Sequence, residues 1–310
     1  MALVSYKRKV ILAKLEVTYG TDSAPVAATD GVLSMNLSLD LAADDLEREL
    51  DHPYLAANPS VLVGRMATVE FDFEPVGHAT LGTAAPSNAI MEACAHAGVS
   101  VASTSFTYNP ISSAAKSATI HFYMGDQRVA ITGCRGTIDF ENEIKKFPKA
   151  HVKLVGQFAI PTTQAIVSPV VTTWQDPPAI ETETWSLTVN SIAVCATMFQ
   201  LSQGNEVPMH ECSEQREVVL TDRKANGKLR IYDPTVGVLD LWTLAKNRTQ
   251  VPIVSIVNGG ANKITTINVP KAQLSLPKFV EIDGVIGLEF DFKALVNSAS
   301  GNDEYTVAYT

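Results

Sequence analysis

The sequence contains few charged, aromatic and histidine residues, and each shortage argues against a class of protein. Charged residues make up 18% of the 310 positions, aromatic residues 7%, and there are 6 histidines. The net charge is −9, and Lys7, Arg8 and Lys9 form only a short basic cluster, so a protein that grips nucleic-acid phosphates is not expected. The low aromatic content argues against a sugar-binding platform. The low charge is compatible with a surface that neighbouring subunits cover.

Cysteines and long hydrophobic runs are also scarce. Cys94, Cys134, Cys195 and Cys212 are too few and too widely spaced for a disulfide framework or a zinc finger. We expect them to be reduced thiols in a protein made in the cytoplasm. The apolar run at residues 10–13 is too short for a secretion signal, and no stretch approaches the length of a membrane-spanning helix. The protein is therefore expected to be soluble.

Motifs for catalysis or cofactor binding are missing as well. The sequence has no Walker-type loop, HExxH motif or GxSxG motif. Cys94 and His96 stand two positions apart in a predicted helix, where their side chains point to different sides, so they do not form a metal-binding pair. The run His210-Glu211-Cys212 is an equally weak candidate. We expect neither an enzyme nor a bound metal or cofactor.

The sequence does contain the alternation of apolar and polar residues that is typical of β-strands. In the first half, this alternation covers residues 32–41, 61–75, 99–108, 118–124, 127–143 and 150–160. Residues 87–97 fit a helix, with Ser87 as its N-cap and Gly98 just after its end. The acidic residues 44–50 fit either a short helix or an extended loop.

Prolines separate this half from a second one. Residues 162–178 contain three prolines among Thr, Ser and Val, and this composition predicts an extended linker. Trp174 in the linker is expected to dock against a domain face, and Trp185 and Trp242 are expected in the core. Beyond the linker, residues 236–246 fit a helix, and strand character covers residues 184–200, 217–220, 228–232, 250–257, 263–269, 272–276 and 285–295.

The order of motifs in the two halves predicts an internal repeat. RMATVEFDFEP (65–75) and KANGKLRIYDP (224–234) each read as a strand that ends in acid–proline, and a helix and further strands follow each of them. Aligning Pro75 with Pro234 puts the alternation out of phase by one residue, so a bulge or a gap must absorb the difference. We predict two tandem β-rich domains, residues 1–162 and 179–310, joined by a Pro-rich linker at 163–178.

Acidic residues line one face of several predicted strands. Glu70, Asp72 and Glu74 share a face because successive side chains of a strand point to opposite sides. The same pattern recurs in two further pairs, Asp139 with Glu141 and Glu289 with Asp291. Such a face is either the solvated side of a half-buried strand or the lining of a channel. A catalytic carboxylate pair is not indicated, because no nucleophile or orienting partner lies nearby.

One segment carries a family resemblance. TYGTDSAPVAATDGVLSMNLSLDL (18–41), followed by a loop into GRMATVEFDFEPVG (64–77), resembles the major tail tube proteins of long non-contractile-tailed bacteriophages. The order of strand, helix and strands in both halves also resembles the tube domain of that family. The resemblance implies a mainly β fold of two tandem β-sandwich domains, each with one flanking helix. It also implies stacked rings whose inner wall is a closed β-barrel made by every subunit.

The function implied by the resemblance is structural. A virion tail protein of this kind is made and assembled in the host cytoplasm, meets other tail proteins at the tube ends, and conducts DNA without binding it specifically. Single-domain members form six-fold rings, so a duplicated chain predicts homotrimeric rings with pseudo-six-fold symmetry. Asp51, His52, Pro53 and Tyr54 are candidates for contacts between subunits. The seven acidic residues are candidates for the lumen, where like charge would repel DNA.

Three alternatives remain open. A tail-tip or hub ring protein would share the tube fold and differ in its copy number in the virion. A two-domain β-sandwich module that binds a carbohydrate or a protein receptor would stay monomeric and expose an aromatic patch. A hydrolase with widely scattered residues would need a pocket with convergent titratable groups.

Overall fold

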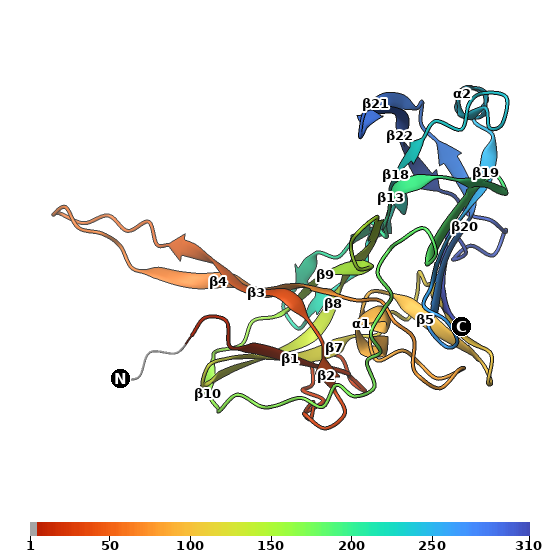
Figure 1. Cartoon of the computed structure of the whole chain (residues 1–310). Helices are drawn as coiled ribbons and strands as arrows, with labels where there is room; N and C mark the ends of the chain where they lie inside the picture. Colours follow the sequence, from red (N-terminus) through yellow and green to blue (C-terminus); the bar gives the residue numbers. More distant parts are fainter. Residues whose placement is uncertain (1–4) are drawn as a thin grey trace.

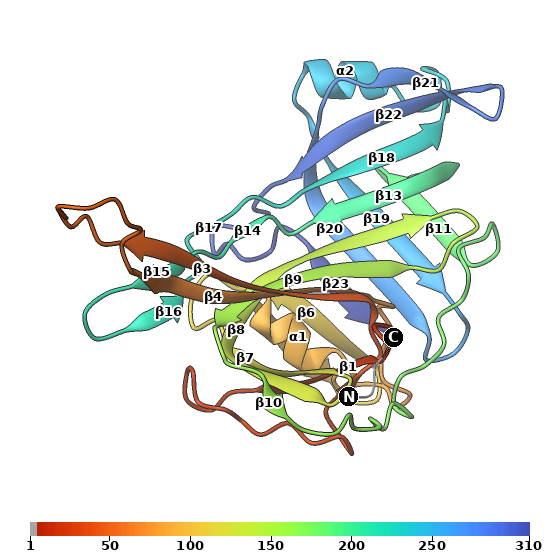
Figure 2. The ribbon, with the colours of Figure 1, turned by 90° about the vertical axis from the view of Figure 1, so that its left-hand side faces the viewer.

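A continuous curved sheet of antiparallel strands runs through both halves of the chain (Figure 2). The computed structural model describes residues 5–310, and its mainly β fold confirms the predicted class. The first half contributes β3 (Met35–Glu47), β4 (Ser60–Phe73), β9 (Lys149–Gln157) and β8 (Gln127–Glu143), paired in that order. The second half contributes β13 (Ala196–Ser202), β18 (Asn226–Tyr232), β22 (Val285–Ala294) and β21 (Lys278–Ile282). A β8–β13 pairing joins the two groups.

The two groups of four strands are connected in the same way. In each group, the first two strands lie side by side in the order in which they occur along the chain. The last two lie side by side in the reverse of their chain order. A short helix follows the second strand of each group, α1 (Asn88–Ala93) after β4 and α2 (Leu241–Lys246) after β18. Neither of these helices, the two found in residues 5–310, is long and apolar enough to cross a membrane.

Further strands form a second layer on one side of this sheet. In the first half, β1 (Lys9–Leu15) pairs with β2 (Gly31–Val32) and β7 (Ala118–Met124), and β7 and β10 (Thr162–Thr163) pair with the beginning of β8. In the second half, β11 (Trp185–Val189) pairs with β12 (Ile192–Val194) and β19 (Gln250–Asn258), and β19 pairs with β20 (Ile264–Leu274). The hairpin of β5 (His96–Val101) and β6 (Ser105–Pro110) reaches β20 through β23 (Thr306–Tyr309).

The core lies between the two layers and follows the two-residue period of the strands. On β4, Ala67, Val69, Phe71 and Phe73 are fully buried, whereas Glu70 between them faces the other side. The core-facing positions of β8, β9, β13, β18 and β22 are mostly apolar in the same way. An exception is Asn142 of β8, which is buried and donates a hydrogen bond to the Ser255 hydroxyl at 3.1 Å. Because only one face of the sheet is packed, the opposite face is free to carry charged side chains.

Two hairpins of the sheet extend beyond it. The β3–β4 hairpin forms an arm that projects far from the body, with residues 48–59 at its tip (Figure 1). The β13–β18 hairpin continues as two small ribbons, β14 (Asn205–Glu206) with β17 (Asp222–Arg223), and β15 (Met209–Glu211) with β16 (Arg216–Val218). A short helix or an extended loop was expected for the acidic residues 44–50. This prediction is wrong for residues 44–47, which belong to strand β3.

Several predicted strands are divided or merged in the structure. Residues 99–108 form parts of two strands, because Ser103 adopts a left-handed conformation and reverses the chain between β5 and β6. Residues 184–200 form parts of three strands, with a turn at Asn190 and Ser191, both of positive φ. Residues 263–269 and 272–276, expected to be separate, belong largely to the single strand β20. The predictions for β7 and β8 match the structure at both ends.

Both helices are shorter than expected. The second begins at Leu241 rather than at residue 236, because Asp240 acts as its N-cap and accepts a hydrogen bond from the Thr243 amide at 2.9 Å. The first ends at Ala93, and Ala95 takes a positive φ that turns the chain into β5. Trp242 is half-buried and contacts Phe279 at the sheet edge in a tilted arrangement, with ring centroids 5.0 Å apart, so it is less buried than expected.

The linker is extended, and it packs along the first half. Trp174 is buried, meets Phe73 edge-on at 5.9 Å, and donates a hydrogen bond from Nε1 to the Gly31 carbonyl at 3.1 Å. The Val170 amide donates to the Ala27 carbonyl at 2.7 Å. The predicted docking of Trp174 is therefore confirmed. Trp185 lies in the core, as expected.

Candidate assembly interface

The free face of the eight-stranded sheet brings together most of the acidic residues singled out in the sequence. Glu70 and Asp72 lie on β4, Asp139 and Glu141 on β8, and Glu289 and Asp291 on β22. All six occupy the face opposite the core. Glu74 follows the end of β4 and is half-buried beside Asp176, and burial raises the pKa of its carboxyl group.

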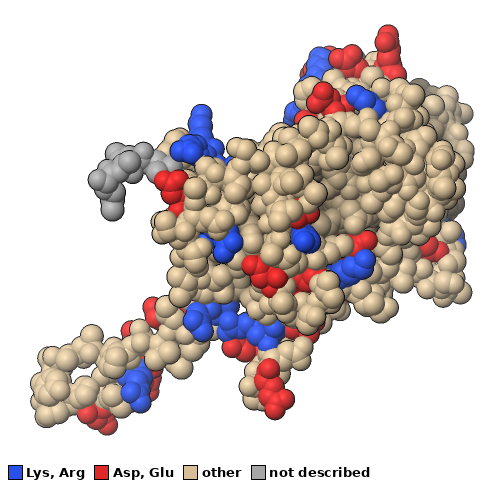
Figure 3. All heavy atoms as spheres, turned by 90° about the horizontal axis from the view of Figure 1, so that it is seen from below, with Lys and Arg blue, Asp and Glu red and all other residues tan. Residues whose placement is uncertain are grey.

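Basic side chains on neighbouring strands accompany these acidic residues. Lys153 on β9 contacts Glu70 at 2.9 Å, and Lys149 lies 3.7 Å from Glu141. Across the junction, the Gln200 side chain of β13 donates to Glu141 at 3.2 Å. The acidic stripe that the sequence suggested is therefore a face of mixed charge, because acidic and basic strands stand side by side. Figure 3, which shows the molecule from below the view of Figure 1, also shows acidic (red) and basic (blue) side chains interspersed on the surface.

The second half repeats this mixture. Glu289 on β22 contacts Lys228 at 2.7 Å and Arg230 at 2.6 Å, both on β18. Hydrogen bonds from Lys228 and Arg230 lower the pKa of Glu289 against the opposing effect of burial. The carboxylate is therefore held in its charged form between two cations. The basic positions are visible in the sequence, because they alternate with apolar residues in the strands 149–157 and 226–232. Their pairing with particular acidic residues is not visible there.

Asp72 is the least accessible of these acidic residues. It is buried, and its carboxylate accepts hydrogen bonds from Asn36 at 2.7 Å and from His151 at 2.7 Å. Burial alone would raise the pKa of Asp72, but these hydrogen bonds and Lys149 at 3.6 Å lower it below its ordinary value. Asp72 therefore ties β3, β4 and β9 together rather than presenting a free charge.

The sheet has two open edges, one in each half. Within residues 5–310, β3 pairs with β4 on one side alone, and β21 pairs with β22 on one side alone. An open edge exposes backbone donors and acceptors that favour pairing with another strand. The edges also expose apolar side chains. Phe279 on β21 is 66% exposed, and Val285 and Ile286 flank it on β22.

An apolar groove lies beside the β3 edge. It has a volume of about 300 Å³, and Leu39, Leu41, Phe122 and Val129 form its floor together with Tyr6. The Lys9 ammonium stands at its rim and donates to the Leu37 carbonyl of β3 at 3.1 Å. One open edge therefore offers an apolar groove, and the other offers a projecting phenyl ring.

The tip of the β3–β4 arm holds the loop residues singled out in the sequence. Asp51, His52, Pro53 and Tyr54 are all exposed, and the rings of His52 and Tyr54 stack at 5.2 Å. The His52 ring also forms a hydrogen bond of 2.9 Å with the Asn58 side chain. Further apolar residues of the arm are exposed, namely Leu46, Leu50, Leu55, Val61, Leu62 and Val63.

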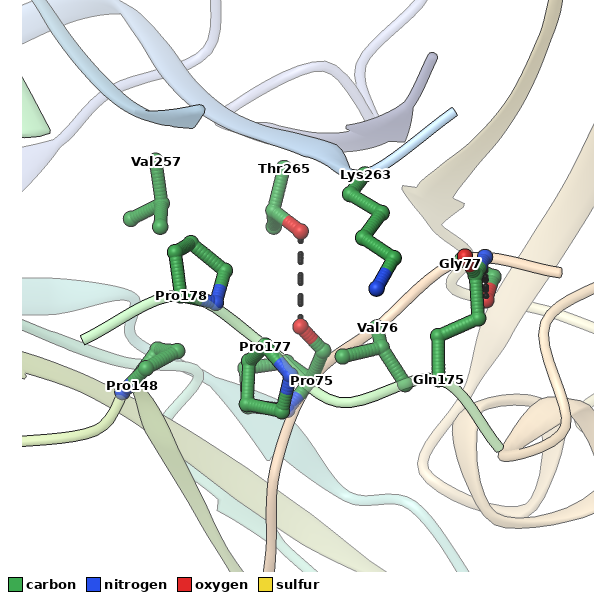
Figure 4. A pocket seen from close by; sticks show the side chains of 10 residues that line it. All are labelled: Pro75, Val76, Gly77, Pro148, Gln175, Pro177, Pro178, Val257, Lys263 and Thr265. Carbon is green, nitrogen blue, oxygen red and sulfur yellow. Dashed lines mark hydrogen bonds between the residues drawn. The ribbon is translucent and has the colours of Figure 1, made fainter. Parts of the chain in front are cut away.

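The seam between the two halves offers little room for a ligand. Proline side chains from three segments meet there, and the Thr265 hydroxyl donates to the Pro75 carbonyl at 3.3 Å (Figure 4). The space is about 10 Å³, which is at the lower limit for holding a single water molecule. In the described chain, residues 5–310, no three His, Cys, Asp or Glu side chains converge as metal ligands.

Comparison with known protein families gives one match. A family model described as phage tail tube protein covers residues 7–294, a range that contains the whole eight-stranded sheet. The chain belongs to the phage tail tube protein family. No curated protein matched the chain significantly. The match confirms that this is a phage tail tube protein, a structural component of a phage tail.

Proposed function

We propose that this tail tube protein forms trimeric rings, which stack into the tail tube of a long non-contractile-tailed phage and conduct DNA to the host. The observation that carries the proposal is the edge-to-edge joint between the two halves. β8 ends the first group of four strands and pairs with β13, which begins the second. The free edges, β3 and β21, are the first and last strands of the same series.

A head-to-tail contact between these two edges would continue the sheet from one copy to the next. Such a contact closes into a ring when its rotation is a whole fraction of a turn. Each copy supplies two equivalent groups of four strands, so three copies give the six groups that a single-domain member of the family supplies with six copies. We therefore propose that residues 1–162 and 179–310 are duplicated tube domains joined by the linker at 163–178, residues 1–4 lying outside the described residues.

Closure by three copies sets the width of the tube. Eight strands from each of three copies make a barrel of 24 strands. With strands about 4.8 Å apart, the barrel has a circumference of about 115 Å and a backbone diameter of about 37 Å before strand tilt widens it. Six copies would double both values. The trimer leaves a channel wide enough for a DNA duplex.

The free face of the sheet is the proposed channel wall. The second layer and both helices cover the other face, so only the charged face can line a barrel interior without filling it. Paired charges on this face leave no basic groove that would follow a phosphate backbone, because Lys153 and Arg230 each contact a carboxylate. DNA would therefore slide through without specific binding.

The exposed loop Asp51–Tyr54 is the proposed contact to another subunit. Its arm has little packing of its own within the chain, and it exposes apolar side chains that a neighbour would bury. Other tail proteins would meet the same surfaces at the tube ends.

Electron microscopy of the purified protein tests the proposal. We expect rings or tubes with three-fold symmetry and a central channel. Particles that remain single at high concentration would contradict the assembly. Reversing the charge of channel-wall residues, Glu70→Lys with Asp291→Lys, should slow DNA release from virions and leave tube formation intact. Glu183→Lys, at an exposed position outside the sheet, is the matched control and should release DNA at the normal rate.

A further inference from the structure

The joint between the two halves has a defined register. Phe140 of β8 lies opposite Leu201 of β13, and both side chains are almost completely buried. On the free face of the sheet, Asp139 lies opposite Ser202. If the outer edges make the same joint between copies, the residues equivalent to these four identify its contacts.

An irregularity shared by both halves fixes the equivalence. In the β7–β8 pair and in the β19–β20 pair, the second strand carries one extra residue. Just beyond it, Cys134 lies opposite Ala118, and Ala272 lies opposite Val251. Cys134 and Ala272 therefore occupy equivalent places.

The equivalence continues into the next strands. One residue further, Arg135 pairs with Val155 of β9, and Gln273 pairs with Lys293 of β22. Val155 and Lys293 are therefore equivalent, and the rest of β9 and β22 follows from them.

The outer edges can now be aligned with the inner joint. Four positions before Val155 lies His151, which is opposite Asp139 of β8. Four positions before Lys293 lies Glu289, which is opposite Lys278 of β21. Lys278 is therefore the equivalent of Asp139, and Phe279 is the equivalent of Phe140.

The other side of the joint follows in the same way. Val69 of β4 and Gly227 of β18 lie opposite equivalent positions of β9 and β22. Their partners on the other side are Leu39 of β3 and Leu201 of β13. Leu39 is therefore the equivalent of Leu201, and Asp40 is the equivalent of Ser202.

We propose that β21 of one copy pairs with β3 of the next in a single antiparallel register, with Phe279 opposite Leu39 and Lys278 opposite Asp40. This inference rests on the proposed ring and specifies its contacts. The Phe279 ring would enter the groove beside Leu39 and Leu41, as Phe140 packs against Leu201 within the chain. The exposed ring and the open groove would thus cover each other.

Charge complementarity favours the same register. Lys278 and Asp40 would form a cross-strand pair of opposite sign on the channel face. Glu281 would lie opposite Leu37. Because the Lys9 ammonium contacts the Leu37 carbonyl at 3.1 Å, Glu281 and Lys9 would form a second pair of opposite charge on the covered face. Each of these proposed pairs would bring opposite charges together. The equivalent residues of the β8–β13 joint do not form pairs of opposite charge.

Cysteine crosslinking tests the register. Cys195 and Cys212 are exposed and are first replaced by Ser to remove background. In assembled rings, oxidation of the Asp40→Cys, Lys278→Cys variant should give covalent dimers and trimers and no longer species. The matched control, Asp44→Cys with Lys278→Cys, shifts one partner by four residues along β3 and should give no ladder.

The outcomes separate the register from the proposed ring. Three-fold rings in which only the Asp44 pair crosslinks, or neither pair does, would overturn the register and leave the ring intact. Charge exchange gives a second readout. Asp40→Lys or Lys278→Asp alone should raise the protein concentration needed for ring formation, and the two changes together should restore it. An unchanged concentration in both single variants, or one that stays raised in the double variant, would also overturn the proposal.

Discussion

The joint between the halves makes a quantitative prediction about stability. Phe199 lies on β13, the strand that connects the two groups, and its side chain is 0% exposed. Its ring stacks on Phe292 of β22, with centroids 6.2 Å apart. Phe199→Ala removes a buried ring that the surrounding sheet cannot replace, so it should lower the free energy of unfolding by about 3–5 kcal/mol.

The same change should affect both halves at once. β13 pairs with β8 of the first half and with β18 of the second, and β23 links β20 to β6 in the other layer. We therefore expect one cooperative transition in urea, with tryptophan fluorescence and far-ultraviolet circular dichroism giving coincident midpoints. Val238→Ala, at an exposed position, is the control and should change stability by less than about 0.5 kcal/mol.

A double-mutant cycle isolates the stacked pair. Phe199→Ala and Phe292→Ala together should differ from the sum of the single changes by about 0.5–1.5 kcal/mol, which is typical of aromatic pairs in contact. A loss below about 1 kcal/mol for Phe199→Ala, or a first half that stays folded after the second has melted, would refute the reasoning.

Two further predictions concern titratable side chains. Burial lowers the pKa of His96 to about 4, so the unfolded chain binds more protons between pH 4 and 6.5, and stability should fall by about 3 kcal/mol as the pH drops through this range. Denaturation at several pH values measures this loss, and a His96→Gln variant with an unchanged pH profile would contradict it. Burial also raises the pKa of the Cys94 and Cys134 thiols. A thiol reagent should therefore label Cys195 and Cys212 in the unassembled folded protein and all four cysteines in denaturant, and rapid labelling of all four in the folded protein would contradict this.

The sequence predicted best those features that depend on local alternation. β7 and β8 match their predicted bounds, because apolar and polar residues alternate over most of their length and Gly125-Asp126 marks the turn between them. The turn at Asn190 and Ser191 escaped prediction because it reverses the chain without glycine.

The features that depend on strand neighbours were not predictable from one strand at a time. Glu70 was visible as an acidic position, but its partner Lys153 lies 83 positions later and depends on the β4–β9 register. The β8–β13 joint is of the same kind, because nothing in either strand specifies which edge it meets. The sequence predicts an internal repeat but does not predict its phase. Under the proposed duplication, the strand pairings align Phe71 with Leu229, so the one-residue offset would lie between the strand and the proline.

Electron microscopy of assembled tubes tests the central claim most directly, because one image gives the number of copies around the axis. The account predicts three copies in each ring, a barrel of 24 strands, and β21 of each copy beside β3 of the next. Six copies in a ring, or a ring in which β3 and β21 lie apart, would contradict it.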